Sequence, residues 1–183
     1  MNSGRHLLRA DLEALVPVDE RERQSVARIL AELDRLPSPF DRDAGPIHVT
    51  ASALLVGPHG VVLHLHKLAG MWLQPGGHLD RGEQPWDAAM REAREETGLD
   101  CRWTAAGQAL FHADVHPAAR GHTHLDLRYL LSAIGDPAPP AGESQQVRWF
   151  SPDEAFAVAD PGLVGALRKL RMGTDRSGAI RWD

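Results

Sequence analysis

The stretch from Gly76 to Leu99 constrains the fold most, because it contains one complete helix with a defined beginning and end. Proline suits the first position of a helix and glycine the residue after its last turn, so Pro85 and Gly98 predict a helix over residues 85–97. Apolar and small residues recur along it at three- and four-residue steps: Trp86, Ala89, Met90, Ala93 and Thr97. One face of the helix is therefore expected to pack on a core.

The opposite face of this helix carries carboxylates. Glu92 and Glu96 are four residues apart, so their side chains are neighbours and repel each other by roughly a few tenths of a kcal/mol in water. A divalent cation would make this arrangement favourable, and Mg²⁺ prefers carboxylate, water and phosphate oxygens as ligands. Arg91 precedes Glu95 by four residues and is expected to hold that carboxylate by charge-assisted hydrogen bonds. The stretch therefore predicts a magnesium site.

The spacing of these residues resembles the Nudix box, the signature motif of the Nudix hydrolases. The match consists of Gly77, Glu83 and the run from Arg91 to Leu99, and every fixed position of the motif is filled. At a usage of about 6–7% for each residue type, such a match is very rare by chance. The one departure is Ala93, which is small where the family usually has a larger aliphatic residue. The resemblance implies an enzyme, a pyrophosphohydrolase that acts on phosphoanhydride bonds.

The resemblance also implies roles for the residues of the box. Glu92, Glu95 and Glu96 would hold Mg²⁺, for which Mn²⁺ can substitute, and Glu83 would contribute directly or through water. Arg91 would orient a glutamate. Family members differ in which carboxylate is the general base, and we expect Glu95 to have this role here, with Glu92 as the next candidate. The predicted catalytic residues are thus Glu95, Glu92 and Arg91.

Glycines shape the predicted site. Gly76 and Gly77 follow a proline, and glycine permits positive φ and lets the backbone approach a ligand closely. By the resemblance, a backbone carbonyl near Gly76 or Gly77 is a further metal ligand. Gly98 ends the helix. These glycines are therefore expected to form the turn of the site and the stop of its helix.

The rest of the chain predicts strands on both sides of the helix and further helices at both ends. Apolar stretches bounded by glycine and proline predict strands over residues 47–56, 61–66, 71–74, 103–114, 124–134 and 145–150. Helical spacing of apolar residues predicts two helices before Pro17 and Pro37, a short helix from Ser151 and a last helix around residues 163–170. This pattern indicates a layered α/β domain. The resemblance makes it a Nudix-like α/β/α sandwich around a mixed sheet, with an N-terminal helical extension.

Changes in composition divide the chain into three parts. Residues 1–45 form the helical extension and a polar connector, residues 46–172 the Nudix hydrolase domain, and residues 173–183 a polar C-terminal tail. The extension is expected to cover one face of the sheet. A contact in a homodimer and a lid over the site are alternatives that the sequence leaves open.

Composition argues against several classes of protein. The 183 residues are 43% hydrophobic and 25% charged, as in one globular domain, and the net charge of −5 argues against a broad basic surface for duplex nucleic acid or a membrane. No apolar run approaches the roughly 18 residues that span a bilayer, and charges interrupt any signal-peptide core. Cys101 is the single cysteine, which favours a reducing, cytoplasmic location. A small diphosphate is the expected partner.

Four residues outside the box are candidates for substrate binding. Trp72 lies just before the box and could stack on a base. His124, Asp126 and Arg128 alternate onto one face of a predicted strand and could meet phosphate or sugar oxygens, or a second metal. Each also has a structural explanation, namely a core aromatic, a hydrogen-bonded histidine and an Asp126–Arg128 pair.

The predicted reaction is Mg²⁺-dependent cleavage of a diphosphate bond, in a nucleoside diphosphate linked to another group or in a nucleoside triphosphate. A non-catalytic nucleotide-sensing module is an alternative, but loss of box carboxylates would favour it and none is lost. Isomerisation of isopentenyl diphosphate, which some relatives of the family perform, needs an added cysteine acid. Cys101 is expected on a partly buried strand, from which it does not obviously reach the box.

Overall fold

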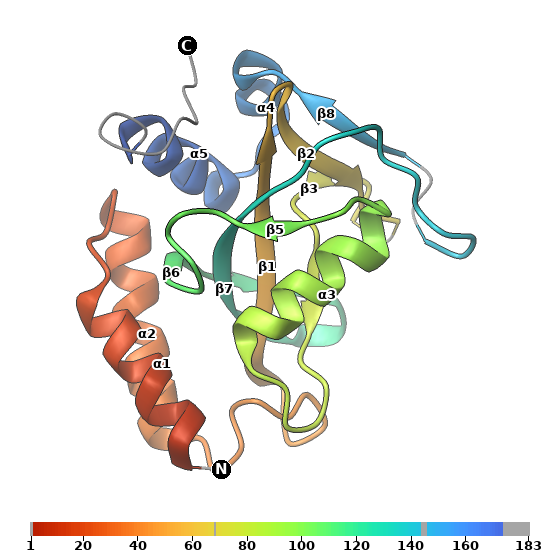
Figure 1. Ribbon diagram of the computed structural model, residues 1–183. Helices are drawn as coiled ribbons and strands as arrows, with labels where there is room; N and C mark the ends of the chain where they lie inside the picture. Colours follow the sequence, from red (N-terminus) through yellow and green to blue (C-terminus); the bar gives the residue numbers. More distant parts are fainter. Residues whose placement is uncertain (1, 68, 144–145, 174–183) are drawn as a thin grey trace.

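The computed structural model describes residues 2–67, 69–143 and 146–173 (Figure 1). Two helices come first, α1 (Asn2–Ala14) and α2 (Glu20–Arg35). The middle of the chain then comprises β1 (Ile47–Gly57), β2 (Gly60–Leu65), β3 (Trp72–Leu73), β4 (Gly76–His78), α3 (Pro85–Thr97), β5 (Arg102–Trp103), β6 (Leu110–Pro117), a 3-10 turn (Ala119–Gly121) and β7 (Thr123–Ser132). The last elements are β8 (Val147–Phe150), α4 (Pro152–Val158) and α5 (Pro161–Gly173).

The strands form one eight-stranded mixed sheet. β1 and β7 run parallel at its centre and pair from Ile47↔Thr123 to Val56↔Ser132, whereas the other strand pairs are antiparallel. β2, β3 and β8 extend the sheet on the β1 side, β5 and β6 pair with β7, and β4 pairs with residues 50–52 of β1. The interior of β1 is buried on both faces, although His48, Thr50 and Ser52 alternate with apolar residues in its first half.

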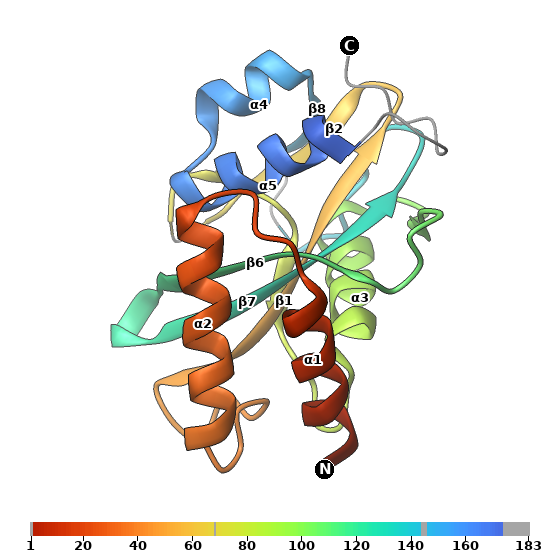
Figure 2. The same ribbon diagram turned by 90° about the vertical axis from the view of Figure 1, so that its left-hand side faces the viewer.

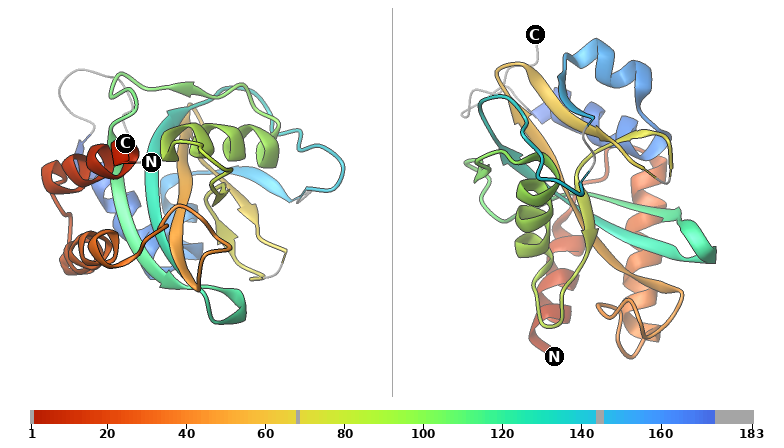
Figure 3. Two further views of the ribbon diagram at one scale, coloured as in Figure 1. Left: turned by 90° about the horizontal axis from the view of Figure 1, so that it is seen from below. Right: turned by 90° about the vertical axis from the view of Figure 1, so that its right-hand side faces the viewer.

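Helices cover both faces of this sheet (Figures 2 and 3). On one face, Ala93 of α3 packs against Ala53 and Leu55 of β1. On the other face, α4 and α5 share a core with β1, β2 and β8: Leu54, Val56, Leu63, Phe150, Ala155, Leu163 and Leu167. Successive residues of a strand point to opposite faces, so the alternation along β1 separates the two cores. The predicted α/β/α sandwich around a mixed sheet is confirmed.

Helix α2 crosses the edge strand β6 and packs against it (Figure 2). The backbone N–H of Ala113 donates to Glu22 Oε1 at 3.3 Å, and that of Val115 donates to Ser25 Oγ at 3.0 Å. An edge strand normally leaves such groups unpaired, so side chains of α2 replace a further strand. The two N-terminal helices also contribute apolar side chains to a core shared with β6 and β7: Leu8, Leu12, Ile29 and Leu33. Within this single chain, the extension therefore covers the sheet.

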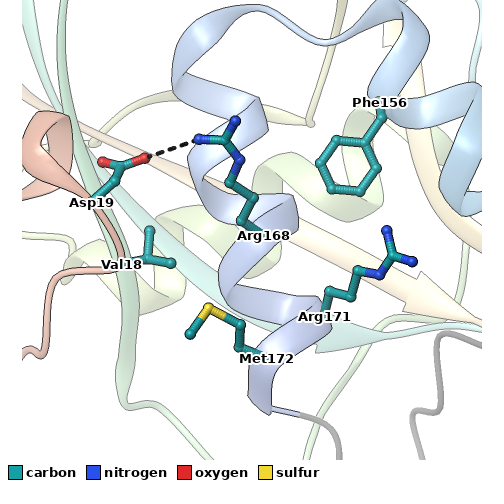
Figure 4. A pocket seen from close by; sticks show the side chains of 6 residues that line it. All are labelled: Val18, Asp19, Phe156, Arg168, Arg171 and Met172. Carbon is teal, nitrogen blue, oxygen red and sulfur yellow. Dashed lines mark ion pairs between the residues drawn. The ribbon is translucent and has the colours of Figure 1, made fainter.

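A buried ion pair joins α2 to α5. Glu22 is fully buried, and its Oε1 accepts from Lys169 Nζ at 2.8 Å. Asp19 caps α2 by accepting from the Glu22 backbone N–H, and its carboxylate lies 3.9 Å from the Arg168 guanidinium of α5. Asp19 and Arg168 line a hollow together with Phe156 (Figure 4). The hollow has a volume of about 340 Å³. The extension and the last helix thus hold each other in place.

One predicted strand is wrong. The apolar pattern over residues 103–114 predicts a continuous strand, but the structure has β5 and β6, separated by a turn in which Gly107 has a φ of 62°. Both strands pair with β7. β5 pairs with Ser132 and Leu131, and β6 pairs with the stretch from Tyr129 back to Thr123. The apolar residues of β5 and β6 look like one strand in the sequence because both strands pair with the same neighbour, β7.

Two further predictions reach residues outside the described ranges. The predicted strand over residues 145–150 includes Gln145, which lies outside them, and β8 is seen from Val147. Residues 174–183 of the predicted tail also lie outside them. Within the described part of the chain, no helix is long and apolar enough to cross a membrane.

Candidate active site

The box glutamates are carried by α3, with the bounds that the sequence predicts. Gln84 is the N-cap, Pro85 starts the first turn, and the backbone N–H of Gly98, whose φ is 68°, donates to the Arg94 carbonyl at the end of the helix. The buried and half-buried face consists of apolar and small residues: Pro85, Trp86, Ala88, Ala89, Met90, Ala93 and Thr97. These small side chains let α3 lie close to the sheet, which brings its carboxylate face onto β4.

β4 fits between β1 and α3 because it begins with two glycines. A Cβ atom on Gly77 would lie 2.5 Å from Glu92 Oε1, and one on Gly76 would lie 2.3 Å from the Cβ atom of Ser52 in β1. Neither position has space for a side chain. The close approach also lets the Gly76 N–H donate to Glu96 Oε2 at 2.9 Å. The prediction that Gly76 and Gly77 form a turn is wrong, because both lie in strand β4 and neither has a positive φ. Their lack of side chains still places the backbone directly against two of the box glutamates.

Arg91 connects the carboxylates to one another. Its guanidinium donates to both oxygens of Glu83 at 3.0 and 2.9 Å, to Glu92 Oε1 at 2.8 Å and to Glu95 Oε2 at 3.0 Å. It also donates to the backbone carbonyl of His78 in β4 at 3.0 Å. A guanidinium suits this role because its N–H groups point in fixed directions. The predicted contact with Glu95 is confirmed, and two further carboxylates share the same arginine.

The glutamates differ in their exposure. The side chains of Glu83, Glu92 and Glu96 are 14%, 16% and 15% exposed, whereas that of Glu95 is 54% exposed. The first three therefore line the inside of the site, and Glu95 stands at its rim. The role of Glu95 as the general base stays a prediction, which now concerns the carboxylate nearest to solvent.

The buried glutamates hold more negative charge than Arg91 neutralises. Burial raises the pKa of Glu96 to about 8, against the effect of its bond from a backbone N–H and with a further increase from the Glu92 charge. Burial also raises the pKa of Glu92, although Arg91 opposes it. Burial acts in the same direction on Glu83, but hydrogen bonds from Arg91 and from a backbone N–H outweigh it and lower the pKa. Glu92 and Glu96 therefore bind protons more readily than ordinary glutamates do, because Arg91 does not fully offset the effect of burial on them.

This donor set fits the magnesium ion that the motif implies. Glu92 and Glu96 offer partly buried oxygens, and their pKa values are raised chiefly because burial disfavours the charged carboxylate. Mg²⁺ prefers hard oxygen ligands, and carboxylates that bind it must lose their protons. A divalent cation would thus supply the charge that the site lacks.

His64 is a neighbour of the carboxylates that the sequence does not assign to the site. It lies on β2, and its Nδ1 is 3.6 Å from Glu96 Oε1. The ring is buried, and burial together with His66 lowers its pKa to about 4. Near neutral pH the imidazole is therefore uncharged, and its contact with Glu96 is not an ion pair. In the sequence, only the alternation of His64 and His66 along a strand points to this face.

Asp126 and Arg128 are buried and bind each other at 2.9 Å. Arg128 Nη1 also donates to the Gly162 carbonyl at 2.6 Å. The Asp126 carboxylate accepts from the Thr50 hydroxyl at 3.2 Å and from the Ser52 hydroxyl at 3.0 Å. These contacts use both groups within the protein, so the structural explanation describes the pair better than contact with a substrate does.

The other two candidate substrate residues lie in different parts of the sheet. Trp72 of β3 is half-buried and packs edge-on against Phe150, with the ring centroids 4.8 Å apart. His124 of β7 lies against three other imidazoles, those of His48, His78 and His116. Trp72 thus belongs to the core on the α5 side. A substrate-binding role for either residue stays a prediction.

Cys101 is fully buried and packs in the core between α3 and the sheet. Burial raises the pKa of its thiol to about 11, and its Sγ lies 3.5 Å from the Leu99 carbonyl. A thiol in this position is neither exposed nor acidic enough to protonate a substrate. The structure therefore argues against the isomerase alternative.

A hollow of about 880 Å³ adjoins the box on the side of Glu83. Its walls come from the start of α1, the connector and the loop before α3: Gly4, Arg5, residues 37–43 and residues 79–85. Arg42 and Arg81, two of its lining residues, are exposed. The sequence does not predict this hollow, because it depends on how the extension packs against the box loop.

Known proteins with similar sequences include nucleotide-cleaving enzymes. The asymmetrical bis(5'-nucleosyl)-tetraphosphatase of Caenorhabditis elegans is 30% identical over 102 residues, which cover 52% of this chain and 70% of that protein. A Bacillus subtilis protein named provisionally as an 8-oxo-dGTP diphosphatase is 30% identical over 120 residues, which cover 65% of this chain and 72% of that protein. Other curated relatives are matched over 38% to 60% of their own length.

A solved structure and a family model extend the similarity to the fold. The crystal structure of a NUDIX-family hydrolase from Clostridium perfringens has a TM-score of 0.58 and 29% identity, and the match covers 68% of this chain and 97% of that chain. The family model of the NUDIX domain matches residues 46–170, from the start of β1 to within α5. The chain belongs to the Nudix hydrolase family, a family of pyrophosphohydrolases, which confirms the prediction from the box.

Proposed function

We propose that this chain hydrolyses a phosphoanhydride bond in a nucleotide, with Mg²⁺ as its cofactor and Mn²⁺ able to replace it. The substrate class is a nucleoside diphosphate linked to another group or a nucleoside triphosphate. The observation that carries the proposal is the glutamate cluster, in which Arg91 binds Glu83, Glu92 and Glu95 and the Gly76 N–H of β4 binds Glu96. The names of the two relatives, a tetraphosphatase and a diphosphatase, support a nucleotide substrate.

In this proposal, Glu92, Glu95 and Glu96 hold the ion, and Glu83 contributes directly or through water. A bound Mg²⁺ supplies neutralisation of phosphate charge and a water of lowered pKa. Arg91 keeps the carboxylates oriented through its hydrogen bonds to three of them. Glu95 at the rim accepts the proton of the attacking water, and Glu92 is the next candidate for this step.

The hollow beside Glu83 is the proposed place for the part of the substrate that does not react. Its volume of about 880 Å³ is in the range of small-molecule sites, roughly 300–1,000 Å³. The guanidinium groups of Arg42 and Arg81 at its wall suit a ligand that carries phosphates. The extension would thus take part in substrate selection, because one wall of the hollow belongs to it.

A panel of nucleotides tests the proposed reaction. The full chain is incubated with nucleoside triphosphates, dinucleoside polyphosphates, nucleotide sugars and ADP-ribose, with Mg²⁺ or Mn²⁺, and the products are identified. We expect turnover of at least one member to require the ion and to fall by about 10³-fold or more in Glu92→Gln and Glu96→Gln. Glu13→Gln is the matched control, because Glu13 is an exposed glutamate of α1 outside the cluster, and it should keep the wild-type rate.

Two outcomes would contradict the proposal. Equal turnover in wild type, Glu92→Gln and Glu96→Gln would place the chemistry elsewhere. Tight binding of one nucleotide without turnover under any of these conditions would replace the hydrolase by the nucleotide-sensing alternative.

A further inference from the structure

Three imidazoles from three different strands meet on the sheet, away from the glutamates of α3. They belong to His48 of β1, His78 of β4 and His124 of β7, and one ring nitrogen of each lies within 4.8 Å of the others. The strand register explains the meeting. His48 is directly opposite His124 in the parallel β1–β7 pair, and His78 pairs with Thr50, two residues further along the same face of β1.

The hydrogen bonding of His48 leaves one of its nitrogens free to bind a ligand. Its Nδ1 lies 3.2 Å from the Gly45 carbonyl, and because a carbonyl only accepts, the proton of the ring is on Nδ1. The lone pair is then on Nε2, which is buried and has no hydrogen-bond partner among the described residues. Histidines that bind metals typically donate their second nitrogen to a carbonyl in this way.

The surroundings keep these rings uncharged, as metal binding requires. Burial lowers the pKa of His48, and it lowers the pKa values of His78 and His124 to about 4, with further lowering by neighbouring imidazoles and, for His78, by Arg42. The Arg42 guanidinium lies 3.5 Å from His78 Nδ1, but its side chain is exposed on the connector and has room to move away. The three rings can therefore bind an ion without first losing a proton to the solvent.

We propose that His48, His78 and His124 form a site for a divalent transition-metal ion, represented by Zn²⁺, that is separate from the magnesium site. Imidazole nitrogens suit Zn²⁺ and its neighbours, whereas Mg²⁺ prefers oxygen. Zn–N bonds of about 2.0–2.1 Å place tetrahedral ligands about 3.3 Å apart, so modest rotations of the side chains would bring the three nitrogens into range. Three protein ligands leave a fourth position for water.

The position of His78 gives such an ion a structural consequence. His78 directly follows the glycines of β4, and its backbone carbonyl accepts from Arg91. An ion bound by the three histidines would fasten β4 to β1 and β7 and so restrain the strand on which the glutamate cluster rests. We therefore expect the ion to raise the melting temperature of the protein.

Metal titration of the untagged full chain tests this site. After treatment with a chelator, the protein is titrated with Co²⁺ and then with Zn²⁺. We expect one Co²⁺ per chain with the intense visible absorption of a four-coordinate ion, which Zn²⁺ then removes. His124→Gln and His78→Gln should weaken binding by at least about 100-fold. His78 and His124 are both half-buried, so these two variants avoid substitution of His48, the fully buried member of the cluster.

Two controls distinguish this site from the others. His59→Gln changes an exposed histidine outside the cluster and should leave Co²⁺ binding unchanged. Glu96→Gln disturbs the carboxylate site and should also leave it unchanged, so the result does not depend on the proposed hydrolase activity. The absence of stoichiometric binding in the wild type would overturn the proposal. Binding that survives in both histidine variants, or that is lost in Glu96→Gln, would overturn it as well.

Discussion

At the scale of single residues, Arg91 organises the candidate active site. Its contact with Glu95 follows from the sequence, because residues four apart on a helix are neighbours. Its contacts with Glu83 and with the His78 carbonyl do not, since they depend on how the loop before α3 and the strand β4 fold against the helix. The sequence therefore predicts which residues gather at the box, and the structure shows how one side chain links them.

Replacing Arg91 by lysine is expected to lower kcat by roughly 10- to 100-fold, because an ammonium group cannot hold three carboxylates in fixed directions. Steady-state kinetics at several Mg²⁺ concentrations measures the effect. Arg94→Lys is the matched control, since Arg94 lies on the same helix but donates to the Cys101 carbonyl and contacts none of the box glutamates. An unchanged kcat in Arg91→Lys would contradict the role given to this arginine.

Gly77→Ala is expected to reduce turnover by at least about tenfold, because its Cβ atom would lie 2.5 Å from Glu92 Oε1 and displace that carboxylate. The backbone conformation itself does not require glycine, since Gly77 is not among the glycines with positive φ. Turnover and thermal unfolding measured side by side separate the two effects. Gly45→Ala, where a Cβ atom meets nothing within 4 Å, should change neither.

At the scale of elements, the sequence predicts an element correctly where residues at its two ends mark its boundaries. Pro85 and Gly98 define α3 without reference to the rest of the fold. The interruption between β5 and β6 was not predictable from the apolar pattern, because both pieces pair with β7. The packing of α2 against β6 was also not predictable, since it depends on Glu22 and Ser25 accepting from the backbone of a distant strand.

Gly98→Ala is expected to destabilise the protein by about 2–4 kcal/mol, because its φ is 68° and its Cβ atom would lie 2.0 Å from the Ala138 carbonyl oxygen. Gly107→Ala has nearly the same backbone strain, with a φ of 62°, but a Cβ atom there meets nothing within 4 Å. Urea unfolding should therefore show a loss of only about 1 kcal/mol for Gly107→Ala. Equal losses in the two variants would show that the contact with Ala138 has no effect.

At the scale of the whole molecule, polar residues of three neighbouring strands are buried together on one part of the sheet. His48, Thr50 and Ser52 of β1 pair with His124, Asp126 and Arg128 of β7, which in turn pair with His116, Asp114 and His112 of β6. Seven of these residues are buried, and His124 and His116 are half-buried. In the sequence, such alternating polar residues indicate a solvated face. They are buried here because α2 and α5 cover them, an arrangement that no local pattern encodes.

This polar interior predicts how stability depends on pH. Burial, followed by the charge of Arg128, lowers the pKa of His112 to about 2, from 6.5 in an unfolded chain. Below pH 6.5 the unfolded state therefore binds a proton that the folded state does not, and the free energy of unfolding falls with pH by about 1.4 kcal/mol per unit for this group. Above pH 6.5 this contribution is constant.

Urea unfolding at pH 7 and pH 5 measures the effect. The wild type should lose about 2 kcal/mol more than His112→Gln between these two values, since the variant lacks the titrating group. His59→Gln, which changes an exposed histidine, should lose as much as the wild type. The same pH dependence in wild type and His112→Gln would contradict a neutral, buried His112.

The central claim, hydrolysis at phosphorus by the carboxylate cluster, is tested most directly in ¹⁸O-labelled water. A nucleotide that the enzyme turns over is cleaved with Mg²⁺ in this solvent, and mass spectrometry locates the label in the products. We predict one ¹⁸O atom in a phosphate group of one product for each bond cleaved, at a rate that falls by about 10³-fold in Glu96→Gln. Products without the label on phosphorus, or labelled at equal rates by wild type and Glu96→Gln, would contradict the claim.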